Sequence, residues 1–305
     1  MLSVRWLRVI GKFYRVPFCL VLVWSLLARG AESPPAKTAP ESKTVPESKV
    51  VPERKVASRR LGTNEVVPSR ILTFFAPLNP YARAQVPRLG TNATVARGAI
   101  VLPEGWNSGR PIPILVVCSP SGSPAIPQLH GYTNAALTEG WAVLAADGPR
   151  VDADRDTVLW NWGTVGSVLE YFQKTVPEAR SWPVAVGGFS GGAKRAACVA
   201  AAFAEARRPL WGVFMGGCNE DRATTGALLF SAGPGFRQTP MFLSNGNADP
   251  IAGPMDGANV RATMEKSGFT RIRAEIYEGA HRLSGQQVRE ALRWFQAQSL
   301  VPRRP

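Results

Sequence analysis

The feature that most constrains the fold is a serine between glycines, placed where a short apolar stretch gives way to an alanine-rich one. Residues 184–189 favour a buried strand and residues 193–207 favour a helix, so Ser190 lies at the apex of a strand–turn–helix unit. So tight a turn predicts a positive φ for this serine. Gly188 and Gly192 are then expected where strand and helix approach too closely for a Cβ. The first N–H groups of the helix would face the serine and favour negative charge there.

A nucleophilic serine needs a base, and the chain contains only two histidines. His281 comes after the serine and follows an extended stretch, residues 271–278. His130 precedes Ser190, in or near an early helix, and most histidines of that kind are simply solvated or hydrogen-bonded. The sequence therefore favours His281 as the base.

Asp249 is the first candidate for the acid that orients the histidine. It lies on a loop just beyond an apolar stretch, residues 240–243, that is typical of a buried strand. Pro250 favours an extended conformation at Asp249 and keeps the loop from becoming helical at once.

With Ser190, Asp249 and His281 in that order, each after a predicted strand, the chain resembles the α/β-hydrolase superfamily, and within it the secreted esterase and polyester-depolymerase-like branch. The resemblance covers roughly residues 67–300. It implies an α/β fold, in which a mostly parallel sheet carries helices on both faces. It also implies that the three residues act as nucleophile, acid and base, cleaving carboxylic esters through an acyl-enzyme.

Other carboxylates remain open as the acid. Glu220 and Asp221 follow a probable strand, residues 210–217, and some hydrolases of this fold place the acid one strand earlier. Asp147 ends yet another predicted strand, residues 141–146, and is interpreted as a carboxylate that structures its loop.

The oxyanion hole departs from the family pattern. Residues 113–118 resemble the family's third strand, but Ser-Pro-Ser-Gly follows where many members carry His-Gly-x-Gly. Pro120 has no N–H to donate, so the amides of Ser121 and Gly191 are the expected donors. This segment is the only sequence feature that favours a non-catalytic binding protein on the same fold. A serine peptidase or amidase is the other alternative.

Two tryptophans and an acidic loop lie on the connection after residues 141–146. Trp160 and Trp162 would lie near the pocket in this fold, where they either bind substrate by stacking or anchor the packing. Asp152, Asp154 and Asp156 alternate as in a calcium loop. The loop lacks the required glycine and glutamate, so we expect a solvated acidic loop.

The remaining pattern fits the same architecture. Further strands are expected at residues 70–75 and 93–102, and helices at residues 157–175, 256–267 and 286–298. Strands that alternate with helices imply a mostly parallel sheet covered on both sides.

No cofactor or metal is expected, since no Cys or His pair has ligand spacing. Once the N-terminal leader is removed, Cys118, Cys198 and Cys218 remain in apolar contexts. Buried thiols are therefore the default, and a single disulfide stays open.

The N-terminal part differs from the rest. Residues 1–30 combine basic residues, a short apolar run and small residues, which is typical of a cleavable secretory signal; a retained anchor is the alternative. Residues 31–66 contain a Pro/Lys/Glu repeat, which predicts an extended, disordered linker. The catalytic domain is expected at residues 67–301, and the mature protein outside the cytoplasm, secreted or periplasmic.

The net charge is +14, and a large part of the excess lies in the first 60 residues. The rest is spread without a basic stripe, which argues against nucleic-acid binding. Association with an anionic envelope is compatible with the charge. The expected partner is an ester substrate, either a small molecule or a polysaccharide or polyester.

Overall fold

The structure is a computed structural model that describes residues 59–107 and 109–299. The predicted secretory signal and most of the predicted linker lie outside these residues. Within them, no helix combines the length and the apolar character needed to cross a membrane.

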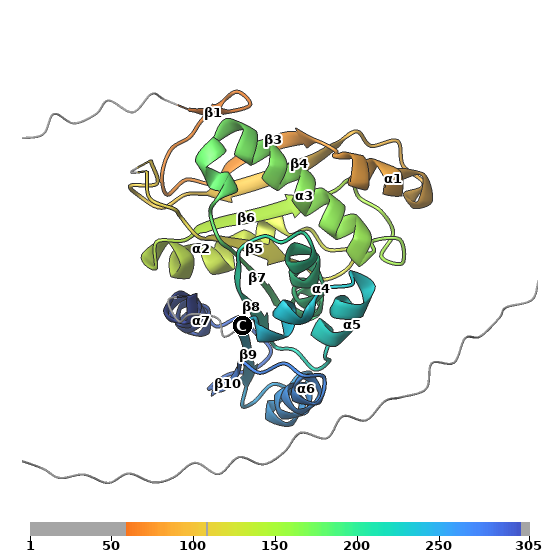
Figure 1. Cartoon of the computed structure of the whole chain (residues 1–305), viewed down its shortest axis with the longest axis vertical. Coiled ribbons are helices and arrows are strands. Elements are labelled where there is room, and N and C mark those ends of the chain that lie inside the picture. Colours follow the sequence, from red (N-terminus) through yellow and green to blue (C-terminus); the bar gives the residue numbers. More distant parts are fainter. Residues whose placement is uncertain (1–58, 108, 300–305) are drawn as a thin grey trace, which may run out of the picture. The chain divides into compact units, whose positions relative to one another are not determined.

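An eight-stranded sheet in the order β10-β9-β8-β7-β5-β6-β4-β3 forms the centre of the described part (Figure 1). Strand β4 pairs antiparallel with both β3 and β6, and the other pairs are parallel. The strands are β3 (Leu72–Pro77), β4 (Val95–Val101), β5 (Ile114–Cys118), β6 (Ala142–Asp147), β7 (Val184–Phe189), β8 (Leu210–Gly216), β9 (Met241–Gly246) and β10 (Ile272–Tyr277). The predicted mostly parallel sheet is confirmed.

Helices cover both faces of the sheet, as expected for strands that are apolar on both sides. They are α1 (Pro80–Leu89), α2 (Leu129–Thr138), α3 (Val158–Thr175), α4 (Gly191–Glu205), α5 (Ala223–Leu229), α6 (Pro254–Lys266) and α7 (Gly285–Ser299). Short 3-10 helices span Ile126–Gln128, Pro177–Arg180 and Pro234–Gln238.

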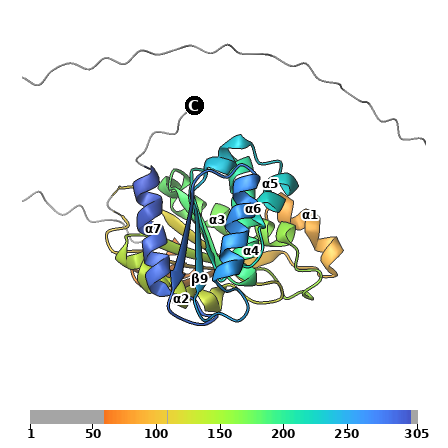
Figure 2. The same ribbon diagram turned by 90° about the horizontal axis from the view of Figure 1, so that it is seen from below.

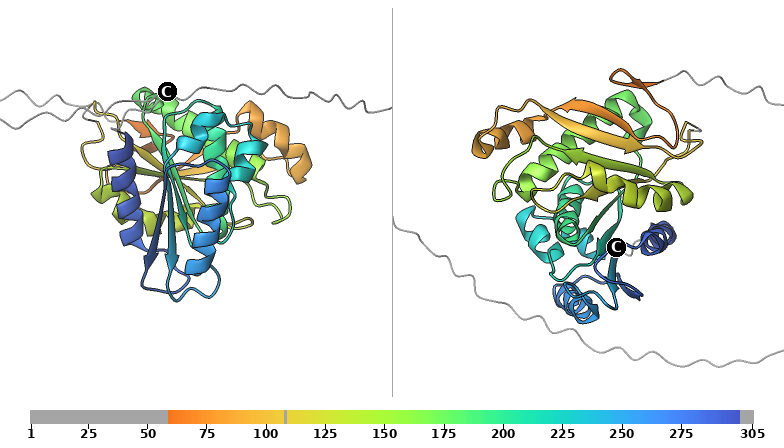
Figure 3. Two further views of the ribbon diagram at one scale, coloured as in Figure 1. Left: turned by 60° about the horizontal axis from the view of Figure 1, so that its bottom comes forward. Right: turned by 180° about the vertical axis from the view of Figure 1, so that it is seen from behind.

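The two faces have separate hydrophobic clusters. Helices α2 and α7 pack on one face, where Leu129 and Phe295 are fully buried. Helices α1, α3, α4, α5 and α6 pack on the other, where Val168 and Val199 are fully buried. Figure 2 and the left view of Figure 3 show α7 and α6 on opposite sides of the sheet. Packing on both faces holds the sheet in place, and because most strands are parallel, their carboxyl ends lie together at one end of it.

Residues 60–66 fold with the domain, although the sequence predicts a linker up to residue 66. A short antiparallel pair joins β1 (Arg60–Leu61) to β2 (Asn64–Glu65). The pair is tied to the core because Leu61 is 0% exposed and Val66 is 7% exposed. The folded unit thus begins before residue 67.

Candidate active site

Ser190 stands between β7 and α4 in the strained conformation that the sequence predicts. Its φ is 57° and its ψ is −125°. Its backbone N–H donates to the carbonyl oxygen of Gly216 on the neighbouring strand β8, at 2.7 Å. This bond ties the turn to β8, and Ser190, which is partly exposed, lies at the carboxyl end of β7.

The two flanking glycines are required sterically, as predicted. A Cβ on Gly188 would lie 2.2 Å from the carbonyl carbon of Gly192. A Cβ on Gly192 would lie 2.4 Å from the carbonyl oxygen of Cys118. Both contacts are with backbone atoms, which cannot move aside without opening the turn. The sequence pattern around Ser190 thus follows from the close approach of β5, β7 and α4.

His281 and Asp249 reach the same edge from neighbouring strands. β9 and β10 run parallel, with Gly246 opposite Tyr277, so the loops after them begin side by side. His281 Nε2 lies 2.9 Å from Ser190 Oγ. His281 Nδ1 lies 2.7 Å from Asp249 Oδ2. The three residues that the sequence singled out therefore form one continuous hydrogen-bonded chain.

The Asp249 carboxylate is held in place by its own loop. Its Oδ1 accepts from the backbone N–H groups of Ile251 and Ala252, each at 2.8 Å, which leaves Oδ2 for the histidine. Burial alone would raise the pKa of Asp249. The hydrogen bonds from the Ala252 amide, the His281 ring and the Ile251 amide outweigh it and hold this pKa below its ordinary value. Asp249 is thus a carboxylate aimed at His281.

The His281 ring is supported by packing as well as by Asp249. Its centroid lies 4.7 Å from that of Phe189, the residue before the serine. A Cβ on Gly217, at the end of β8, would lie 3.2 Å from His281 Cε1, so the ring also packs against that backbone. Phe189 and the Gly217 backbone therefore limit the movement of the ring.

The alternative acids have other partners. Glu220 forms ion pairs with Lys194 at 3.1 Å and with Arg222 at 2.8 Å. Asp221 caps α5 by accepting from the backbone N–H groups of Ala223 and Thr224, at 2.9 and 3.0 Å. In this structure Asp249 is the carboxylate that contacts His281.

Asp147 stabilises a neighbouring loop, as the sequence predicts. Its carboxylate accepts from the backbone N–H groups of Ala125 and Ile126, at 2.5 and 3.3 Å. The other histidine, His130, is exposed on α2.

The expected oxyanion donors come from two segments that touch. Gly191 is the first residue of α4, and a Cβ there would lie 3.0 Å from the Pro120 Cβ. Ser121 follows this proline in the loop after β5. In the described part of the chain, neither the Ser121 nor the Gly191 amide N–H donates to a protein acceptor. Both amides are thus available to a ligand.

An ion pair that was not predicted from the sequence contacts this loop. Arg195 of α4 contacts the Asp156 carboxylate at 3.1 Å, and their side chains are 5% and 13% exposed. Asp156 was expected in a solvated acidic loop, and the structure corrects this because Arg195 buries its carboxylate. The one available signal was an arginine within the alanine-rich run that starts α4.

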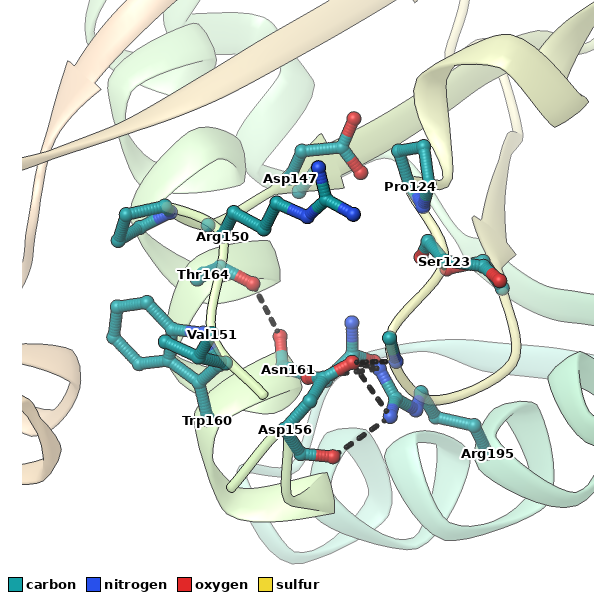
Figure 4. A pocket seen from close by; sticks show the side chains of 15 residues that line it. Ser123, Pro124, Asp147, Arg150, Val151, Asp156, Trp160, Asn161, Thr164 and Arg195 are labelled. Atoms are coloured by element: carbon teal, nitrogen blue, oxygen red, sulfur yellow. Dashed lines mark hydrogen bonds and ion pairs between the residues drawn. The ribbon is translucent and has the colours of Figure 1, made fainter. Parts of the chain in front are cut away.

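A pocket of about 330 Å³ opens beside this ion pair, and both Asp156 and Arg195 line it (Figure 4). Its wall includes Ser119 and Gly122 from the loop after β5, and Asn161 and Thr164 from α3. Asn161 is 6% exposed, and its Oδ1 has no hydrogen-bond partner within the described residues. The pocket therefore borders the candidate oxyanion loop, and its wall has a polar side chain with unused hydrogen-bonding capacity.

The two tryptophans have different surroundings. Trp160 lines the pocket but is only 2% exposed, and Gly148 packs directly against its indole. Trp162 is half-buried and packs edge-on against Phe203, with ring centroids 4.9 Å apart. Trp162 is not among the residues that line this pocket.

Cys118, Cys198 and Cys218 are free and buried, in agreement with the default expectation. Burial raises the pKa of the Cys118 thiol to about 12 and that of the other two to about 11. Within residues 59–107 and 109–299, no group of three or more His, Cys, Asp and Glu side chains could hold a metal ion.

No family model matches the sequence, and no curated protein matches it significantly. Solved structures do match. A bacterial heroin esterase is 16% identical with a TM-score of 0.52, covering 75% of this chain and 84% of its own. A lipase/esterase from Lactobacillus plantarum is 14% identical with a TM-score of 0.52, covering 76% and 100%. An esterase from Pyrobaculum calidifontis is 14% identical with a TM-score of 0.52, covering 77% and 87%. With its mostly parallel eight-stranded sheet and helices on both faces, the chain has the α/β-hydrolase fold.

Proposed function

We propose that this protein is a serine hydrolase that cleaves carboxylic esters through an acyl-enzyme. The observation that carries the proposal is the hydrogen-bonded chain from Ser190 through His281 to Asp249, with distances of 2.9 and 2.7 Å. The positive φ of Ser190 supports it, because a strained turn that exposes a hydroxyl is typical of a nucleophile.

In the proposed reaction, His281 Nε2 takes the proton from Ser190 Oγ as this oxygen attacks the ester carbonyl carbon. The Ser121 and Gly191 amides donate to the carbonyl oxygen as it becomes negatively charged. The protonated His281 then gives its proton to the departing alcohol. Water, activated by the same ring, releases the acid and restores the serine. Asp249 holds the Nδ1–H throughout and stabilises the imidazolium.

The pocket bordered by Ser119 and Gly122 is the proposed place for one side of the ester. Both residues flank the segment that contains the Ser121 amide, which supports this role although Ser190 and His281 do not line the pocket. The Asn161 amide suits a substrate with a polar group. We propose that Trp160, which lines this pocket, forms part of the wall that contacts the substrate. For Trp162, the packing on Phe203 favours the anchoring role that the sequence left open.

Two alternatives use the same fold. A peptidase or amidase would need the same three residues, so only the substrate distinguishes it. A non-catalytic binding protein is disfavoured because it has no need of a strained serine hydrogen-bonded to a histidine. Turnover of p-nitrophenyl acetate and of a matching p-nitroanilide by the wild type and Ser190→Ala separates the three. We expect ester hydrolysis only in the wild type, faster than amide hydrolysis.

The polyester-depolymerase-like branch and secretion are further parts of the proposal. They rest on the sequence of residues 1–66 and on the family resemblance. Mass spectrometry of the protein recovered from periplasm and medium tests secretion, since we expect a mature N-terminus close to residue 30. Release of soluble acid from a polyester film tests the substrate class.

A further inference from the structure

The Arg195–Asp156 pair connects two parts of the site that lie far apart in the sequence. Arg195 Nη1 donates to both oxygens of the Asp156 carboxylate, at 3.2 and 3.1 Å. Its Nη2 donates to the backbone carbonyl oxygen of Asp156 at 2.9 Å and to Asp156 Oδ2 at 3.1 Å. The guanidinium therefore fixes the loop before α3 onto α4.

The same pair holds the loop that contains Ser121. Arg195 Nη2 donates to Ser121 Oγ at 2.6 Å. The backbone N–H of Gly122 donates to Asp156 Oδ2 at 2.7 Å. The loop is thus held through the Ser121 hydroxyl and through the Gly122 N–H. The Ser121 N–H, in contrast, has no protein acceptor within the described residues.

Helix α4 provides the common base. It begins at Gly191, whose amide is the other expected donor, and it carries Arg195 one turn further along. The positions of both donors therefore depend on the same helix, α4. An amide that must meet a developing oxyanion gains from this, because such donors act mainly through being placed before the reaction.

We infer that Arg195 and Asp156 are positioning residues that hold the Ser121 amide in place for the oxyanion. This inference rests on the proposed function. Pro120 has no N–H, and the Gly122 N–H already donates to Asp156, so among residues 120–122 the Ser121 amide is the remaining donor.

A direct role in substrate binding fits Arg195 poorly. Arg195 lines the pocket, but its side chain is only 5% exposed and both terminal nitrogens already donate to protein oxygens. A role in stability alone also explains little, since a buried ion pair is often no more stabilising than apolar residues of similar volume. Neither role accounts for the hydrogen bonds that the pair makes to Ser121 and Gly122.

The test compares Arg195→Lys and Asp156→Asn with Arg208→Met as a matched control. Arg208 is a half-buried arginine before β8, at the opposite edge of the sheet. It donates to Gln173 Oε1 at 2.7 Å and to the Arg180 carbonyl oxygen at 3.2 Å. Its loss reproduces the removal of a structural arginine without touching the candidate oxyanion loop. Thermal unfolding of each variant is measured alongside turnover.

We expect Arg195→Lys and Asp156→Asn to lower kcat about 10- to 100-fold, as a donor displaced by roughly 1 Å would. KM should stay within about threefold, because the ground-state carbonyl needs the donor less than the oxyanion does. Inhibition by a trifluoromethyl ketone, which forms an oxyanion on Ser190, should weaken by the same factor as kcat. Arg208→Met should leave both unchanged.

A third variant, Ser121→Ala, leaves the Arg195–Asp156 ion pair intact. Ser121→Ala keeps the amide and removes only the hydroxyl that Arg195 contacts, at an exposed position. It should lower kcat about 2- to 10-fold, the value of one hydrogen bond, with KM unchanged. Full kcat in this variant would overturn the inference even if Arg195→Lys and Asp156→Asn fail to fold.

The outcomes separate the two proposals. An active wild type whose Arg195→Lys and Asp156→Asn variants keep kcat within about threefold of the Arg208→Met control overturns the positioning role alone. A wild type that hydrolyses no ester and forms no adduct at Ser190 overturns the proposed function, and the inference with it.

Discussion

Asp249 Oδ2 lies 2.7 Å from His281 Nδ1, although 32 residues separate the two in the chain. Their contact follows from the parallel pairing of β9 and β10, which starts the two loops side by side. The second Asp249 oxygen is occupied by backbone N–H groups, so the carboxylate has one orientation. Asp249 is therefore the proposed acid, and the first prediction concerns its removal.

Asp249→Ala is expected to lower kcat for p-nitrophenyl esters by roughly 10⁴-fold, because His281 loses the group that fixes its tautomer. Steady-state kinetics on purified, folded protein measures this. Glu220→Ala and Asp221→Ala are the matched controls and should keep kcat within about threefold. A larger loss at either control than at Asp249 would move the acid to the earlier strand.

Asp221→Ala has its own expected effect. Asp221 accepts from two backbone N–H groups at the start of α5, so its loss should cost about 0.5–2 kcal/mol of folding free energy. Chemical denaturation checks this value. Unchanged stability would mean that the cap contributes nothing in solution.

The Asp249 interactions should stabilise the fold only above acidic pH. The pKa of Asp249 is lower in the folded chain than in the unfolded one, where an aspartate has a pKa of about 3.9. The unfolded state therefore binds the proton more tightly, and this stability is lost as the pH falls through the folded pKa. Denaturation of the wild type and Asp249→Asn from about pH 5 to about pH 2 should show their difference shrinking. A difference that grows on acidification contradicts the sign.

Gly188→Ala should prevent proper formation of the serine turn. The added Cβ would lie 2.2 Å from the carbonyl carbon of Gly192. We therefore expect the free energy of unfolding to fall by about 1–3 kcal/mol or more, and the activity to be lost. Gly233→Ala is the control, since no atom lies within 4 Å of a Cβ built there. Equal stability of the two variants would show that the turn is more open than the structure indicates.

Removal of residues 31–58 should leave turnover of soluble esters unchanged. The proline-punctuated repeat there provides few side chains that could pack on a domain. The deletion stops before Arg59, because Arg59 forms an ion pair with Glu178. Kinetics of the full and shortened proteins on p-nitrophenyl acetate make the comparison. A collapse of turnover would show that the repeat packs on the catalytic domain.

Local patterns predicted most of the strands and the serine turn because each depends on neighbouring residues. The apolar run of β5, for example, is buried throughout. Helix α1 was not predicted, although Asn79 caps it and Pro80 starts it. Its weak apolar pattern and the internal Pro87 hid these signals.

The Arg195–Asp156 pair could not be predicted from local signals. The two residues lie 39 positions apart, and each belongs to a segment with a different apparent purpose, an alanine-rich helix and an acidic loop. Only the packing of α3 against α4 brings them together. The sequence favoured Asp249 over Glu220 and Asp221, but all three follow predicted strands, and only the structure shows which carboxylate contacts His281.

Covalent labelling of Ser190 tests whether this residue is the proposed nucleophile. A fluorophosphonate probe reacts with a serine activated by a histidine, so peptide mass spectrometry should place one adduct on Ser190 in the wild type. Ser190→Ala should give none, and His281→Ala should react far more slowly while remaining folded. An unlabelled wild type, or labelling that persists in Ser190→Ala, would contradict the proposed nucleophile.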